Sequence, residues 1–407
     1  MPWREDGQEL SVLTAAALFG ANGSGKTNVL KAMDDMQTLV VHSFRQGRPS
    51  GGVPRKSFML DPDAREAPSR FEVDLILDGI RWEYGFVVDN ECVREEWAYR
   101  YPRGRAALVF HRHPEGMDLG PADRAKGRAV GELLRPNALF LSTAASANHP
   151  TLQRLYGWFE RNLLLAEADS RPWRQALTTA MLNDDDPASR ERVLALLRAA
   201  DLGITGARKR PLDPETKEWM QRIVRVLLDE KGEGDGTFEG PDFDQLGVQL
   251  VHRGADGDVE LEPEDESLGT RVWFGIVGPV IRVLSQGSVF LADELDASLH
   301  PALVAQLIRL FRDHSTNPRR AQLIFNSHDA SLLGGSTGDR LLGRDQIWFT
   351  EKDETGGTRL YPLADLDPRK EEAVGKRYLA GRYGAVPLIS HQEFAAAADL
   401  ITSGDRD

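Results

Sequence analysis

The sequence predicts an α/β fold in which buried parallel strands alternate with helices, joined by an antiparallel side sheet and a helical insertion. Two observations predict it. The apolar run at 12–19 leads into a glycine-rich loop and then a helical pattern. From 267 onward, helical patterns at 271–285 and 301–314 alternate with buried-strand patterns at 288–294 and 321–328. Such alternation is typical of a parallel sheet covered by helices.

Length and composition bound the class of protein. The chain has 407 residues, which suggests two to three structural units, and its 41% apolar and 28% charged content is ordinary for a globular protein. A net charge of −13 argues against a protein that coats nucleic acid, although a local basic groove stays compatible with it. One cysteine, Cys92, excludes an internal disulfide, and neither a signal peptide nor a long apolar span is evident. We therefore expect a cytoplasmic protein that does not bind membranes.

Three regions follow from the patterns along the chain. Residues 1–150 form a predicted N-terminal lobe, in which alternating strands at 71–79 and 80–89 meet at an Asp78-Gly79 hairpin signal. Residues 151–238 form a predicted helical insertion, with helical patterns at 151–165, 188–201 and 213–230 that are far too short for a coiled-coil arm. Residues 239–407 form a predicted C-terminal lobe that includes a strand hairpin at 345–353 and 358–366.

The glycine-rich loop matches G-x-x-x-x-G-K-[ST] at every position from Gly20 to Thr27. Glycines let the backbone turn its N–H groups toward phosphate oxygens, and the following helix adds its positive end. Lys26 is expected to reach the β- and γ-phosphates, and Thr27 to offer a hydroxyl to Mg²⁺. The sequence therefore predicts ATP and Mg²⁺ as ligands. The predicted nucleotide-binding residues are Gly20, Ala21, Asn22, Gly23, Ser24, Gly25, Lys26, Thr27 and Asn28.

An apolar strand at 289–292 ends in Asp293 and Glu294. Together with the phosphate loop, this pattern predicts that Asp293 helps to hold Mg²⁺ and that Glu294 takes a proton from the attacking water. Two weaker signals flank it. Ser267 and Gly269 open a predicted helix and could form a second anion site or a plain helix cap. His328 ends the strand at 321–328, where it could bond a γ-phosphate or lie on an exposed loop.

The order of these elements resembles the ATP-binding-cassette ATPases, including the SMC, RecF and RecN heads. The resemblance implies a P-loop NTPase fold with a cassette-like core, in which Lys26, Glu294 and His328 are catalytic. It also implies that the Ser267–Gly269 helix of one subunit closes over ATP on the phosphate loop of another. The functional unit would then be a homodimer or a larger even-numbered oligomer.

Three further stretches narrow the resemblance: Asp293 to Pro301, Asn326 to Asp329, and 345–353 with 376–389. They are similar to AAA-family ATPases of the abortive-infection and restriction-associated group, which includes RloA-like and OLD-family relatives. This implies an ATP-driven switch that controls a nuclease or toxin from the same operon in anti-phage defence. In that group a strand usually begins well before the phosphate loop, whereas here only 19 residues precede Gly20. A missing or replaced first strand and a misassigned start codon explain this equally well. No glutamine loop is assigned, and His300 replaces a common aspartate.

The sequence is also compatible with other functions. A DNA-repair head of the RecF or SMC type would clamp nucleic acid, and the basic stretch 369–382 could then contact it. A nucleotide sensor would bind ATP without turnover. Glu351 and Asp353 faintly resemble the start of a TOPRIM nuclease, although a plain hairpin fits better. His111 and His113 could ligate a metal, although two surface histidines explain that spacing as well.

Overall fold

A six-stranded sheet organises the centre of the protein. The computed structural model describes residues 3–5, 8–10, 12–102, 104–167, 170–210, 247–262, 265–334, 340–369, 372–387 and 390–403. The sheet order is β16-β15-β3-β14-β13-β9, and every pairing is parallel except that of β16 with β15. The strands are β3 (Ala15–Gly20), β9 (Leu163–Ala166), β13 (Val289–Ala292), β14 (Gln322–Asn326), β15 (Ile347–Lys352) and β16 (Thr358–Pro362).

Side-chain alternation gives this sheet two buried faces. In β13, Phe290 and Ala292 pack into the larger core, whereas Val289 and Leu291 pack with Leu30 of the helix that follows the glycine-rich loop. A parallel sheet needs helices on both faces. The covering helices are α1 (Lys26–His42) on one face and α9 (Leu268–Gln286) and α10 (Pro301–Arg312) on the other.

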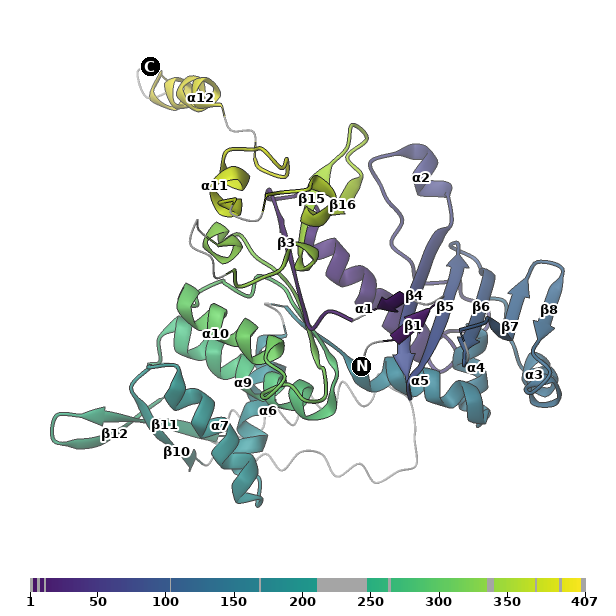
Figure 1. Ribbon diagram of the computed structural model, residues 1–407, viewed down its shortest axis with the longest axis horizontal. Helices are drawn as coiled ribbons and strands as arrows, with labels where there is room; N and C mark the ends of the chain where they lie inside the picture. The colour runs from purple at the N-terminus through teal and green to yellow at the C-terminus, as the bar shows by residue number, and fades with distance from the viewer. Residues whose placement is uncertain are drawn as a thin grey trace.

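The antiparallel side sheet lies beside α1 (Figure 1). Its Asp78-Gly79 turn has positive φ at both residues, as the predicted hairpin requires. A second core joins this sheet to α1, α4 and α5. Its strands are β4 (Ser69–Leu77), β5 (Ile80–Val88), β6 (Val93–Tyr101), β7 (Ala107–His113) and β8 (Gly116–Leu119), and the nearby helices are α2 (Pro62–Glu66), α3 (Arg124–Gly131), α4 (Phe140–Ser146) and α5 (Pro150–Asn162). A separate ribbon pairs β1 (Trp3–Glu5) with β2 (Gln8–Leu10).

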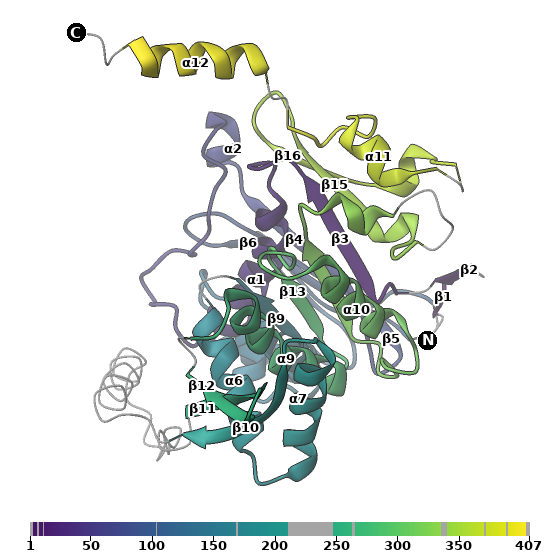
Figure 2. The same cartoon turned by 90° about the vertical axis from the view of Figure 1, so that its left-hand side faces the viewer.

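A third group of elements packs against α9. The Thr178 hydroxyl on α6 donates to the Phe274 carbonyl at 2.7 Å and accepts from the Gly278 amide at 3.0 Å, which ties the two helices together. The group contains α6 (Arg171–Asn183), α7 (Pro187–Ala199), β10 (Ile204–Arg210), β11 (Gly247–Gly254) and β12 (Gly257–Leu261). Both views place it at the opposite end of the molecule from β15 and β16 (Figures 1 and 2).

α9 is long and apolar enough to cross a membrane by length and composition alone. In the fold, however, its apolar side chains lie in the larger core, among residues of α6, α7 and the central sheet. Its ends are set locally, because the Ser267 side chain caps the start and Gly287, with φ 75°, ends it.

The C-terminal part of the chain continues past the hairpin. α11 (Val374–Leu379) packs beside the short turn η2 (Ala330–Leu333), because Gly375 lies close to the Ala330 and Gly334 carbonyls. α12 (His391–Ser403) stands clear of the rest of the protein in both views (Figures 1 and 2).

The structure refines the region 151–238 that the sequence predicts as a helical insertion. Leu163–Ala166 leaves the predicted helix and forms β9, because this short apolar run pairs in parallel with β13 at the edge of the central sheet. Most of 151–167 therefore belongs to the central sheet and its neighbouring core. The predicted helix at 213–230 lies outside the described residues. The hairpin at 345–366 is confirmed by β15 and β16.

Gly278→Ala should destabilise the protein by about 1–3 kcal/mol, since a Cβ there would lie 2.8 Å from the Thr178 backbone nitrogen. Gly275→Ala is the matched control in the same helix, because its Cβ would meet nothing closer than 3.5 Å. That change should be neutral or should stabilise by up to about 1 kcal/mol. Urea unfolding measures both, and equal midpoints for the two variants would contradict this packing.

Candidate functional site

The phosphate loop connects β3 to α1 and is tightly constrained. Gly25 caps α1 with φ 102°, a left-handed conformation that glycine adopts without strain. The Lys26 ammonium donates to the Gly20 carbonyl at 2.9 Å and to the Ala21 carbonyl at 3.0 Å. Burial lowers the pKa of Lys26, while nearby Glu294 acts in the opposite direction. The loop residues Asn22 and Gly23 are exposed, so an incoming phosphate can reach them.

The order of the central strands brings distant residues to this loop. β14 lies between β3 and β13, so the ends of all three strands meet at the carboxyl edge of the sheet. The Thr27 hydroxyl donates to Asp293 Oδ1 at 2.8 Å. Asn326, buried at the end of β14, donates from its side-chain amide to the same Asp293 oxygen and lies 3.5 Å from the Thr27 hydroxyl. The fold thus brings together Thr27 and Asp293, the two residues that the sequence assigns to Mg²⁺.

Glu294 occupies an unusual backbone conformation next to this cluster. It has φ 51°, in the left-handed region that non-glycine residues rarely adopt, and its side chain is exposed. Its amide donates to the Asn326 side-chain oxygen. One buried amide group, that of Asn326, therefore fixes both Asp293 and the backbone of Glu294. Strain of this kind persists where surrounding groups determine it, and it often marks a functional site.

Asn326 is the main residue that the sequence analysis assigned no role. An asparagine at a strand end carries little information by itself, because its neighbours on the adjoining strands are not visible in the sequence. His328, two residues later, is exposed, and its amide donates to Asp296 Oδ2 at 3.2 Å. β14 ends at Asn326, so His328 lies on the exposed loop that follows this strand, at the same edge of the sheet as Asp293.

Glu167 is a second residue without a predicted role. It directly follows β9, and β9 pairs with β13, so its carboxylate joins the same edge of the sheet as Asp293. The Asp293 amide donates to the Ala166 carbonyl at 2.9 Å, and Glu167 pairs with Lys31 of α1 at 3.0 Å. Its position beside the acidic pair could have been inferred only from the strand order.

Ser267 and Gly269 occupy the exposed start of α9. The Ser267 hydroxyl accepts from the Thr270 amide at 3.1 Å, so the plain helix cap is present. Gly269 lies against the Ser298 carbonyl on the loop that follows Glu294, where a Cβ would approach to 2.9 Å. Among the described residues, Ser267 and Gly269 form no hydrogen bond to the phosphate loop, and neighbouring Leu268 is 45% exposed. The start of α9 therefore faces solvent and does not contact the phosphate loop of its own chain.

The oxygen donors at this edge suit Mg²⁺. A Thr27 hydroxyl and an Asp293 carboxylate are hard oxygen ligands, and Mg²⁺ is usually bound by one or two such groups together with substrate phosphates. No cluster of three or more metal-binding side chains occurs among the described residues, as expected where phosphates and water supply the remaining ligands.

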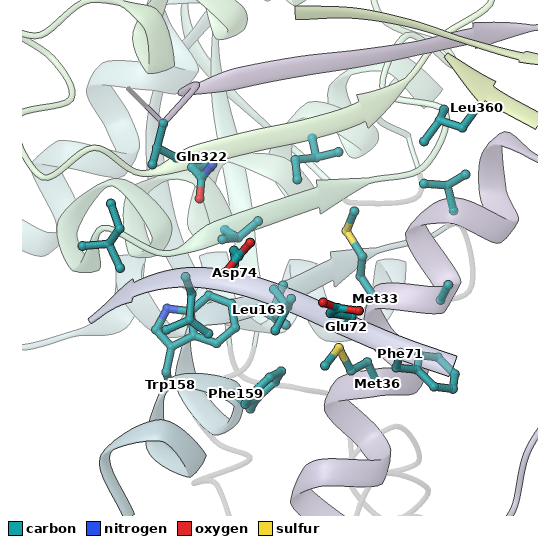
Figure 3. Close-up of a pocket in the computed structure, with 18 of the residues that line it drawn as sticks. Met33, Met36, Phe71, Glu72, Asp74, Trp158, Phe159, Leu163, Gln322 and Leu360 are labelled. Atoms are coloured by element: carbon teal, nitrogen blue, oxygen red, sulfur yellow. The ribbon is translucent and has the colours of Figure 1, made fainter. Parts of the chain in front are cut away.

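A groove of about 1120 Å³ runs alongside α1 and touches the phosphate loop only at one end, through Gly25 and Asn28. Figure 3 shows β4 crossing it, with Met33 and Met36 of α1 on one side and Trp158 of α5 below. Within the described part of the chain β4 pairs with β5 alone, and its residues 70–76 line the groove in an unbroken run.

The weaker signals have structural explanations. His111 pairs with Glu95 at 2.8 Å and His113 with Glu115 at 2.9 Å, so each histidine has its own carboxylate partner. Glu351 lies in the β15–β16 hairpin, where it accepts from Tyr361 at 2.8 Å. In the basic stretch 369–382, Arg377 pairs with Glu372 at 3.1 Å, whereas Lys376 and Arg382 are exposed.

Comparison with known proteins places the chain. The family model described as "AAA domain, putative AbiEii toxin, Type IV TA system" matches residues 15–334. The chain belongs to this AAA family. Its match spans the phosphate loop, the acidic pair and His328. No curated protein matches the chain.

Solved structures resemble this AAA-family chain over most of its length. The SMC head domain from Thermotoga maritima is 11% identical, with 89% of this chain and 96% of that chain covered and a TM-score of 0.38. A Smc head bound to the C-terminal domain of ScpA, derived from Pyrococcus furiosus, is 13% identical, with coverage of 88% and 93% and a TM-score of 0.32. The ATP-binding cassette MJ0796, solved as a post-hydrolysis dimer with ADP and Pi, is 10% identical, with coverage of 88% and 90% and a TM-score of 0.31. These likenesses place no residue of this chain; the strand order and the family match define its fold.

Asn326→Ala should lower the turnover number for ATP by about 100-fold, because Glu294 and Asp293 would lose the group that orients both. The KM for ATP should change little, since the phosphate loop keeps its own contacts. Phosphate release at varied ATP measures both constants, and a melting curve checks folding. A folded variant with wild-type turnover would show that Asn326 does not orient the site.

Proposed function

We propose that this protein is an ATP-hydrolysing switch. Two copies of the chain would close over two ATP molecules and separate after hydrolysis. One observation carries the enzymatic part: Thr27, Asp293, Asn326 and Glu294 form one hydrogen-bonded group at the tip of the phosphate loop. Family membership supports ATP as the nucleotide. The proposal includes the division of the chain into an N-terminal lobe at 1–150, an insertion at 151–238 and a C-terminal lobe at 239–407. It also includes a cytoplasmic location.

The residues divide the chemistry between them. Loop amides from Asn22 to Thr27 and the start of α1 bind the phosphates, and Lys26 supplies a positive charge at the β–γ bridge. Thr27 and Asp293 would hold Mg²⁺, which neutralises phosphate charge when it is bound. Glu294 accepts a proton from water as the water attacks the γ-phosphorus, and the bond to the β-phosphate oxygen breaks. His328 lies where it can bond the γ-phosphate and register its departure.

The exposure of the candidate site supports the pairing of two chains. The Glu294 and His328 side chains are exposed, so one chain alone does not exclude water from the reacting phosphate. The outward-facing start of α9 offers the Ser267 hydroxyl, the glycine backbone of Gly269 and a positive helix end. Placed over a second chain's phosphate loop, it would complete the nucleotide site in a two-fold symmetric dimer.

The proposed output is control of a partner effector, a nuclease or toxin from the same operon, in anti-phage defence. The support is the family description, which names a toxin of a type IV toxin–antitoxin system. Co-purification of a neighbouring gene product, with loss of phage protection in a Lys26→Ala strain, tests this output. If the purified chain alone instead binds DNA in a salt-dependent way through Lys376 and Arg382, the DNA-repair head is the better description.

Glu294→Gln should bind ATP but release no phosphate. It should accumulate as a dimer with Mg²⁺ and ATP, because ATP that is not hydrolysed keeps the two chains together. Light scattering with and without ATP measures the mass, and Lys26→Ala, which should weaken nucleotide binding itself, is the contrasting variant. Normal turnover in Glu294→Gln would remove Glu294 from its role as base.

Leu268→Glu, introduced into the Glu294→Gln protein, should abolish the ATP-dependent dimer without loss of ATP binding, because it places a charge at the start of α9. Leu133→Glu is the matched control, since Leu133 is comparably exposed, at 58%, beyond α3 of the N-terminal lobe. A dimer that survives Leu268→Glu would show that the heads pair through another surface.

A further inference from the structure

The C-terminal hairpin β15–β16 is in direct contact with the phosphate loop. β15 pairs with β3 in parallel, with Thr350 opposite Gly20, and β16 follows at the edge of the sheet. Two hydroxyls reach the loop from this hairpin. Thr350 Oγ1 lies 2.6 Å from Ser24 Oγ, and Thr358 Oγ1 donates to the Ser24 carbonyl at 3.0 Å. Both threonines lie more than 320 positions from the loop in sequence, so the loop's motif includes neither of them.

The fit between hairpin and loop leaves no spare room. A Cβ on Gly20 would lie 2.4 Å from the Thr350 hydroxyl, and one on Gly25 would lie 2.1 Å from the Thr358 hydroxyl. Two glycines of the motif therefore serve the approach of the hairpin as well as the curvature of the loop.

The direction of the Thr358 hydrogen bond has a consequence for phosphate binding. The peptide bond between Ser24 and Gly25 is trans and planar, so its carbonyl and its N–H point in opposite directions. A hydroxyl that captures the Ser24 carbonyl on the hairpin side turns the Gly25 N–H to the other side, away from the hairpin. Lys352 donates to the Thr358 hydroxyl at 3.0 Å, so the hydroxyl proton is left to point at Ser24.

We propose that Thr358 is a positioning residue of the nucleotide site, which sets the Ser24–Gly25 peptide so that the Gly25 N–H faces the phosphates. Thr350 fixes the neighbouring Ser24 side chain in the same way. The C-terminal hairpin thereby belongs to the nucleotide site, and a displacement of the hairpin would lower affinity for the phosphates. This inference rests on the proposed function, because it assigns a role within that same site.

A second set of contacts connects the same region to the loop after β14. Tyr378 of α11 stacks on Phe349 of β15 with ring centres 5.5 Å apart, and it packs edge-on against Phe19, the residue before the loop. A Cβ added to Gly375 of α11 would lie 2.8 Å from the Ala330 carbonyl in η2, which closely follows His328, so α11 packs tightly against that turn. The hairpin and α11 therefore form one packed unit behind both the phosphate loop and the His328 loop.

The test is Thr358→Val, which keeps the branched shape and strand preference but removes the hydroxyl. Thr358→Ser keeps the hydroxyl, and Thr355→Val is the matched control, since the Thr355 hydroxyl donates to Asp353 Oδ1 at 2.7 Å, within the hairpin turn. Isothermal titration with a slowly hydrolysed ATP analogue gives Kd, and phosphate release gives KM and kcat separately.

Thr358→Val should raise Kd and KM about three- to tenfold, the value of one lost hydrogen bond, with kcat within about twofold of wild type. Thr358→Ser and Thr355→Val should match the wild type. A hairpin that only stabilised the fold would instead lower the active fraction, and thus kcat, without a change in KM.

Unchanged Kd in Thr358→Val, or an equal shift in Thr355→Val, would overturn the positioning role and leave the proposed function intact. Failure of the wild type to bind the analogue would instead overturn the proposed nucleotide site itself.

Discussion

The hydrogen bond between the Thr27 hydroxyl and Asp293 is the interaction on which the rest of the site depends. It joins two residues 266 positions apart, and it forms only because β14 separates β3 from β13 by a single strand. The same middle strand supplies Asn326, whose amide reaches Asp293 on one side and the Glu294 backbone on the other. The candidate site is thus built where the ends of three strands meet.

This arrangement explains why the surrounding elements are so strictly packed. α1 covers one face of the sheet through Leu30, while α9 and α10 cover the other, so the strands cannot shift relative to each other without opening a core. Thr178 on α6 then fixes α9, whose start carries Ser267. A chain of direct contacts therefore runs from the nucleotide edge of the sheet to the exposed helix start that we propose to engage a second head.

The residues that the sequence assigns to the candidate site are those that a local pattern identifies. Gly20 to Thr27 and the Asp293-Glu294 pair are recognisable because each function needs certain residue types at fixed spacing after a strand. Asn326 and Glu167 were given no role because a polar residue at a strand end acquires one only from its neighbours in the sheet. Thr358 is harder still to predict from the sequence, because its partner is a backbone carbonyl on a loop that it contacts only through the pairing of β-strands.

Fold prediction failed in a similar way at one point. The run at Leu163–Ala166 continues a helical pattern, yet it forms β9, because the central sheet offers β13 as a parallel neighbour with which all four residues pair. The Asp78-Gly79 turn shows the opposite case. There the two turn residues determine the hairpin by themselves, and the predicted turn is confirmed.

The central claim is that one nucleotide site is completed by two chains. Native mass spectrometry of the wild-type protein with Mg²⁺ and a slowly hydrolysed ATP analogue tests it most directly. We expect a complex of two chains, each of 45.2 kDa, carrying two nucleotides, and free chains when the nucleotide is withheld. A single chain that binds one nucleotide with no change in assembly would contradict it.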